Sequence, residues 1–137
     1  MTRADGRGHG RRMAYGHEAD LEMAIDADER GPGGSITLAL CGSLDHPPPC
    51  PLAPHHTDVR RDASVVSVRT LFAAMPDDEL AVRRAIAAAL ASGSTVAPDG
   101  TTVRWVLLGE RPVTLHPGEA DHARRLIASA EGDRSSD

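Results

Sequence analysis

The feature that most constrains the fold is an amphipathic helix pattern over residues 76–92. Pro76 and the three acidic residues after it suit a first helical turn, where amide protons lack partners and the helix dipole is positive. Apolar residues follow at helical spacing, at Val82, Ala85, Ile86, Ala89 and Leu90. Gly93 then ends the pattern. Residues 117–130 carry a second apolar stripe, so the sequence predicts two helices that must cover one common apolar surface.

Alternating apolar residues predict the strands that supply this surface. Period-two patterns occupy residues 35–41, 64–72 and 102–108, and residues 113–115 read as a short edge strand. The predicted fold class is α+β, with a four-stranded, mostly antiparallel sheet and two helices on one face. The predicted order is ββαββα, a circular permutation of the βαββαβ order of a ferredoxin-like sandwich. That fold hosts many unrelated functions, so it identifies no chemistry.

The ends of the chain read differently from its middle. Residues 1–34 join an arginine- and glycine-rich block to an acidic block with few large apolar groups. Such a segment buries too little surface to offset its chain entropy, so we expect a disordered or weakly helical tail. The Gly-Pro-Gly-Gly run at 31–34 marks the predicted domain boundary. Residues 35–131 then form a single α+β domain, and residues 132–137 a frayed tail.

The most biased stretch, residues 41–56, holds both cysteines, three of the seven histidines and five of the ten prolines. Zinc is usually four-coordinate and binds thiolate and imidazole. The sequence therefore predicts a metal site, most simply for zinc, with the candidate ligands Cys41, His46, Cys50, His55 and His56. Adjacent histidines on an extended chain point in opposite directions, so only one of the last two is expected to ligate. The prolines stiffen the segment and reduce the entropy lost when it orders.

Several alternatives stay open for this stretch, because eight residues separate the cysteines and no Cys-x-x-Cys occurs. It also reads as a proline-rich surface loop, a disulfide or redox pair, or a polyproline recognition surface with Pro48 and Pro51 at the required spacing. A thiol-dependent enzyme using Cys50 or Cys41 is the alternative from a different class. The prolines on both sides of Cys50 remove amide donors that an oxyanion hole would use. We therefore favour a non-enzymatic metal-binding or protein-interaction module, for example an accessory subunit that works with another protein.

The composition limits the ligands and the cellular location to be expected. The net charge is −5, which argues against a general nucleic-acid binder. All 15 basic side chains are arginine, a bias typical of GC-rich coding. No apolar run reaches the roughly 18 residues of a membrane span, and the start lacks a signal-peptide pattern, so we expect a cytoplasmic protein. Trp105 is interpreted as an anchor of the core. His116 is interpreted as a helix-entry residue, and His122 as a solvated residue on an outer helix face.

Overall fold

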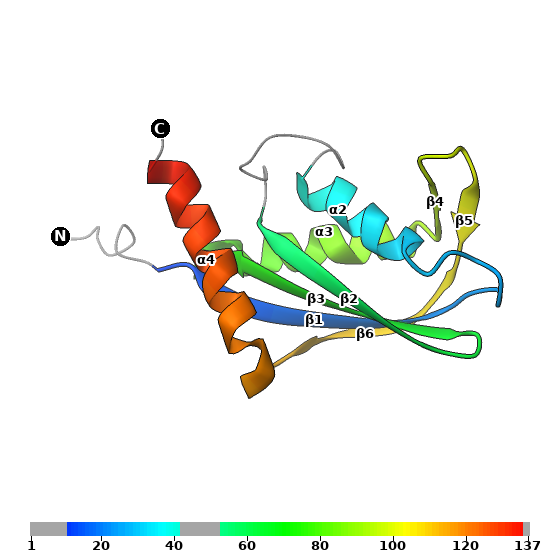
Figure 1. Ribbon diagram of the computed structural model, residues 1–137, viewed down its shortest axis with the longest axis horizontal. Helices are drawn as coiled ribbons and strands as arrows, with labels where there is room; N and C mark the ends of the chain where they lie inside the picture. The colour runs from blue at the N-terminus through cyan, green and yellow to red at the C-terminus, as the bar shows by residue number, and fades with distance from the viewer. Residues whose placement is uncertain (1–10, 42–52, 136–137) are drawn as a thin grey trace.

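The computed structural model describes residues 11–41 and 53–135 of the chain. The strands are β1 (Met13–Glu22), β2 (His55–Asp62), β3 (Val65–Ala74), β4 (Ser94–Val96), β5 (Thr102–Arg104) and β6 (Val106–Val113). The helices are α2 (Gly31–Cys41), α3 (Glu79–Ala91) and α4 (Ala120–Ser135), and the 3-10 turns η1 (Pro76–Asp78) and η2 (Pro117–Glu119) precede α3 and α4 (Figure 1).

Four strands form one sheet in the order β2-β3-β1-β6, and every neighbouring pair is antiparallel. The predicted α+β class with a four-stranded antiparallel sheet is therefore confirmed. The permuted order is wrong, because only one strand, β1, precedes the first helix, whereas two strands were predicted there. The elements of the sheet and its first two helices run βαββαβ, which is the unpermuted ferredoxin-like order. The predicted count of two helices is also wrong, since α4 is a third helix among the described residues.

The strand missed by the sequence reading is β1, which lies in the segment expected to be a tail. It occupies a central position in the sheet and pairs with both β3 and β6. Ala19 and Leu21 are buried against the main core, whereas Glu18 and Asp20 alternate with them on the other face. In the sequence β1 resembles a solvated segment, because the arginine partners of its outward acids lie far along the chain.

The first predicted strand is instead the helix α2, which begins within the predicted domain boundary. Ile36 and Leu40 are fully buried, whereas Leu38 is 41% exposed, so the burial repeats every four residues rather than every two. The glycines permit close packing: a Cβ on Gly31 would lie 2.6 Å from Cγ1 of Val103. The Gly-Pro-Gly-Gly run is therefore the start of a tightly packed helix and not a linker.

The main core lies between the sheet and the two helices α2 and α3, which cover one face (Figure 1). The helix predicted over residues 76–92 is confirmed, and its apolar stripe Val82, Ile86 and Leu90 is buried. Trp105 is only 5% exposed, and its indole Nε1 donates a 2.8 Å hydrogen bond to the carbonyl of Leu90. Its role as a core anchor is confirmed, although it separates β5 from β6 where one continuous strand was predicted.

Helix α4 packs on the opposite face of the sheet, at one end of it (Figure 1). The prediction that the helices over residues 76–92 and 117–130 cover one common face is therefore wrong. A smaller second core forms there from Leu71, Ala73 and Leu126, with Leu115 and Ile127 packed beside them. The rest of this face carries no other described helix. Among the described helices, none combines the length and apolar character needed to cross a membrane.

Candidate functional site

The two histidines at the start of β2 point to opposite sides of the sheet, as predicted for adjacent residues of a strand. His55 lies on the α2 side, where its Nε2 is 3.0 Å from Oγ1 of Thr37 and its Nδ1 is 3.3 Å from the carbonyl of Ala53. Since the carbonyl only accepts, Nδ1 donates to it and Nε2 accepts from the threonine hydroxyl. Burial lowers the pKa of His55 and favours this neutral form. A metal at His55 would have to displace one of these contacts.

On the other face, His56 lies against His122 of α4. Their ring centroids are 4.0 Å apart and the ring planes make an angle of 38°. The Nε2 of His56 is 3.3 Å from Oδ1 of Asp58. The pKa of His122 is lowered, first by desolvation and then by the neighbouring positive groups of His56 and Arg125. Two imidazoles from different elements are therefore in contact at a tilted angle, and one of them has a carboxylate partner.

Three of the predicted ligands cannot be placed in this geometry. His46 and Cys50 lie outside the described residues, and Cys41 ends α2 with a side chain that is also outside them. The thiol-dependent alternatives stay predictions for the same reason. Within residues 11–41 and 53–135, no three or more His, Cys, Asp or Glu side chains are arranged to hold a metal ion. The described part of the chain therefore offers a histidine pair rather than a complete ligand set.

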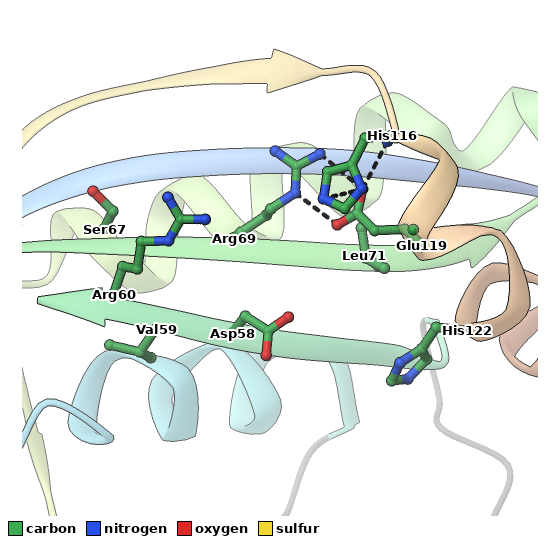
Figure 2. Close-up of a pocket in the computed structure, with 10 residues that line it drawn as sticks. Asp58, Val59, Arg60, Ser67, Arg69, Leu71, His116, Glu119 and His122 are labelled. Atoms are coloured by element: carbon green, nitrogen blue, oxygen red, sulfur yellow. Dashed lines mark hydrogen bonds and ion pairs between the residues drawn. The ribbon is translucent and has the colours of Figure 1, made fainter.

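A pocket of about 350 Å³ lies beside this pair, between β2, β3 and the start of α4 (Figure 2). The polar side chains that line it include Asp58, Arg60, Arg69, His116, Glu119 and His122. His116 is the N-cap residue of η2, which agrees with its interpretation as a helix-entry residue. His122 is only partly exposed and faces His56, so its interpretation as a solvated residue is wrong. Its position in the first turns of a helix that covers the sheet is the signal that the sequence reading missed.

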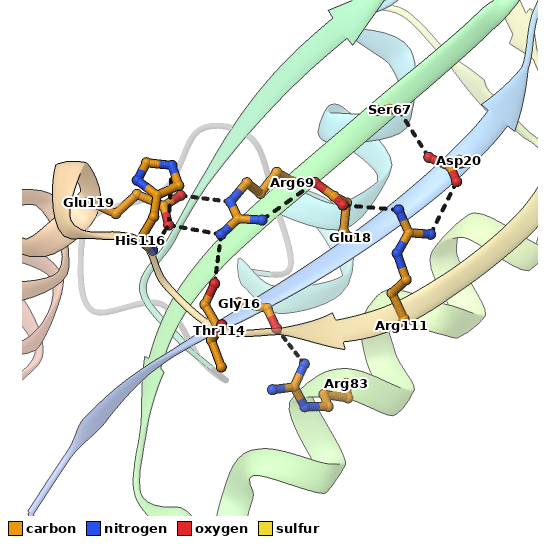
Figure 3. Close-up of polar contacts among 10 residues, drawn as sticks. All are labelled: Gly16, Glu18, Asp20, Ser67, Arg69, Arg83, Arg111, Thr114, His116 and Glu119. Atoms are coloured by element: carbon orange, nitrogen blue, oxygen red, sulfur yellow. Dashed lines mark hydrogen bonds and ion pairs between the residues drawn. The ribbon is translucent and has the colours of Figure 1, made fainter.

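One wall of the pocket is held by the ion pair between Arg69 and Glu119. The guanidinium donates two hydrogen bonds to this carboxylate, at 2.7 and 2.9 Å, and a further one at 2.9 Å to the carbonyl of Thr114 (Figure 3). The backbone N–H of His116 also donates to Glu119, at 3.0 Å. These donors, Arg69 above all, lower the pKa of Glu119 to about 2. The contact fixes the start of α4 to the sheet.

The same network continues across β1 to β6. Arg69 also lies 3.4 Å from Glu18, and Arg111 binds Glu18 at 2.9 Å and Asp20 at 3.1 Å. The hydroxyl of Ser67 donates to Asp20 at 2.9 Å (Figure 3). Glu18 and Asp20 are thus paired with arginines on the neighbouring strands, and these two charges are satisfied within the chain.

A second polar cluster lies on the core side and has a structural role. His17 is buried, with Nε2 2.8 Å from Glu110 and Nδ1 3.1 Å from a guanidinium nitrogen of Arg83. Because a guanidinium only donates, Nδ1 accepts and the proton resides on Nε2, which donates to Glu110. Arg83 also donates to the carbonyl of Gly16 at 2.7 Å. The cluster ties α3 to β1 and β6.

Comparisons with protein-family models, with curated proteins and with solved structures found no match for this chain. The function is therefore argued from the chemistry of the site. Its distinctive part is the pair His56 and His122, since imidazole nitrogens are common ligands of zinc and of other divalent transition metals.

Proposed function

We propose that this chain is a small, non-enzymatic binding module for a divalent transition-metal ion, zinc first, at the end of the sheet where β2 begins. The observation that carries the proposal is the 4.0 Å separation of the His56 and His122 rings. His56 belongs to the ligand set predicted from the sequence, and His122 is an addition from α4. The cytoplasmic location and the protein partner expected from the sequence stay predictions.

The carboxylate of Asp58 supports His56 as a ligand. With Nε2 donating its proton to Asp58, the lone pair of His56 resides on Nδ1 and is available to a metal. The lowered pKa of His122 favours the neutral imidazole, which is the form that binds metals. The contact with Asp58 thus orients the ring of His56, and the lowered pKa of His122 favours its ligating form.

Two imidazoles fill two of the four positions that zinc usually has. The other positions are left to water or to further side chains, and the sequence prediction assigns them to Cys41, His46 and Cys50. A site completed by thiolates would bind zinc much more tightly than a histidine pair alone. Replacing each cysteine by serine measures that contribution.

The decisive experiment is a zinc titration of chelator-treated protein, together with elemental analysis of protein purified without chelator. We expect about one equivalent of metal in the wild type and an affinity at least about tenfold lower in His56→Ala and His122→Ala. His116→Ala is the matched control, since this imidazole lines the same pocket but has a 61% exposed side chain. Metal well below one equivalent contradicts the proposal. If His122→Ala binds zinc as tightly as the wild type, the histidine pair is not the metal site.

A further inference from the structure

The half of the sheet face beyond α4 exposes three large apolar side chains. Val65, Val106 and Leu108 are 40%, 60% and 54% exposed. Val65 and Val106 both pair in register with Glu22, so Val65, Glu22 and Val106 lie in one row across the sheet. Leu108 lies at the β-bulge opposite Asp20 and Leu21, and the alternation along β6 places it on the same face as Val106.

The same area carries two opposite charges that have no partner within residues 11–41 and 53–135. Arg60 and Asp62 are exposed residues two apart on the edge strand β2, so they lie on one face. Among the described residues, neither side chain forms a hydrogen bond or an ion pair. The neighbouring charges Glu18, Asp20 and Arg111 are already paired with one another. An unpaired cation and an unpaired anion beside an apolar row are therefore available to another molecule.

We propose that this uncovered half-face binds a second copy of the chain, face to face, about a two-fold axis that runs across the strands. The axis lies between two neighbouring rows and exchanges them. One row is Asp62, Val65, Glu22 and Val106, and the next is Arg60, Ser67 and Asp20 with the bulge residues Leu108 and Gly109. Arg60 of one copy then meets Asp62 of the other, and Val106 meets Leu108. Two-fold symmetry forms each of these contacts twice, as an isologous interface requires.

The dimensions of the sheet fit this arrangement. Two residues of a strand span about 7 Å, so an axis midway between the rows opposes their side chains directly. Packed sheets lie about 10 Å apart, which leaves room for valine against leucine and for an extended arginine. Five residues on each of four strands cover roughly 300 Å² of flat area on each copy. A standard interface buries about 800 Å² on each partner, so the expected dimer is weak and reversible.

One contact opposes the association. The same axis brings the exposed Glu22 of one copy against Asp20 of the other. Asp20 is already held by Arg111 and Ser67, so the repulsion falls mainly on Glu22. Glu22→Gln should therefore tighten the dimer, whereas most surface changes at an interface weaken it.

Sedimentation velocity over concentrations from about 5 to about 500 µM tests the proposal, with a chelator present so that metal bridging cannot contribute. R60D and D62R should each weaken the dimer at least about tenfold, because both symmetric ion pairs become repulsive. The double variant R60D/D62R reverses each pair and should restore association. V106D should abolish it, and L80D is the matched control, since Leu80 is 57% exposed on α3, which covers the other face of the sheet.

Three results would overturn the proposal: a wild-type chain that stays monomeric over the whole range, a dimer that R60D and V106D leave unchanged, or a double variant that does not regain association. Far-ultraviolet circular dichroism of each variant checks that the fold is kept. All of the substituted side chains are exposed, so loss of structure is not expected.

Discussion

Replacing Glu119 by glutamine tests the contact that fixes α4 to the sheet. The carboxylate is nearly buried, with a side chain 9% exposed, and Arg69 lowers its pKa from 4.5 to about 2. Each pKa unit corresponds to about 1.4 kcal/mol, so the ionised form contributes on the order of 3 kcal/mol to folding at neutral pH. Glutamine keeps a weaker, neutral hydrogen bond to Arg69. We therefore expect Glu119→Gln to lower the free energy of unfolding by about 2 kcal/mol.

The pH dependence of this loss is the sharper test. Since the folded-state pKa lies below the unfolded one, the contribution of Glu119 is complete above pH 4.5 and is lost as the pH falls toward about 2. Urea unfolding, followed by the fluorescence of the buried Trp105, measures the difference between wild type and variant at each pH. The difference should shrink steadily below pH 4.5. A difference that stays constant down to pH 2 would refute the reasoning.

Asp121→Asn is the control for the Glu119 experiment. Asp121 lies two residues further along in α4 and pairs with Arg124, but its side chain is 76% exposed. Exposed ion pairs contribute about 0–1 kcal/mol, so the substitution should change stability by a few tenths of a kcal/mol. An equal loss in both variants would show that a charge near the helix start matters, and not the bidentate contact to Arg69.

Two further predictions concern the main core. Gly31→Ala should destabilise the protein by about 1–3 kcal/mol, because the added Cβ overlaps Val103. Gly34→Ala in the same helix meets nothing within 4 Å and should raise the free energy of unfolding by about 0.5–1 kcal/mol. The midpoints of thermal unfolding of the two variants should therefore shift in opposite directions. Trp105→Phe removes the hydrogen bond to the buried carbonyl of Leu90 and should lower the free energy of unfolding by about 1–3 kcal/mol. Urea unfolding followed by circular dichroism measures this loss. An unchanged midpoint would contradict the role of Trp105 as a core anchor.

The helices and strands that the sequence predicted well are those whose pattern is fixed by local spacing. Helix α3 has a proline at its start and a clear apolar stripe, and β3 alternates Val66 and Val68 into the core. The strand predicted over residues 35–41 was wrong because Ile36, Leu38 and Leu40 alternate with period two, whereas in α2 only Ile36 and Leu40 share the buried face. The exposure of Leu38 distinguishes the helix from the strand, and that depends on packing against the rest of the fold.

The candidate site was predictable only in part. The alternation of His55 and His56 follows from strand geometry alone, and it placed one of them on each face of the sheet. The partner of His56 was not predictable, because His122 comes from a helix that packs on the second face, and no local pattern specifies which face a helix covers. The charged face was missed for a similar reason: Glu18 resembles a solvated acid until Arg69 and Arg111 are brought beside it.

The central position of β1 has a consequence for how the chain acquires its fold. Met13 pairs with Ala74, and Gly16 pairs with Val113, so the strand nearest the start of the chain depends on partners far along it. During synthesis β1 leaves the ribosome early but must wait for β3, and then for β6, before both of its edges are paired. Folding dominated by such distant contacts is slow, and an unpaired central strand is exposed to aggregation meanwhile. Until Arg69 and Arg111 are in place, Glu18 and Asp20 leave β1 with unpaired charges, and charged side chains oppose the pairing of an open strand with another chain.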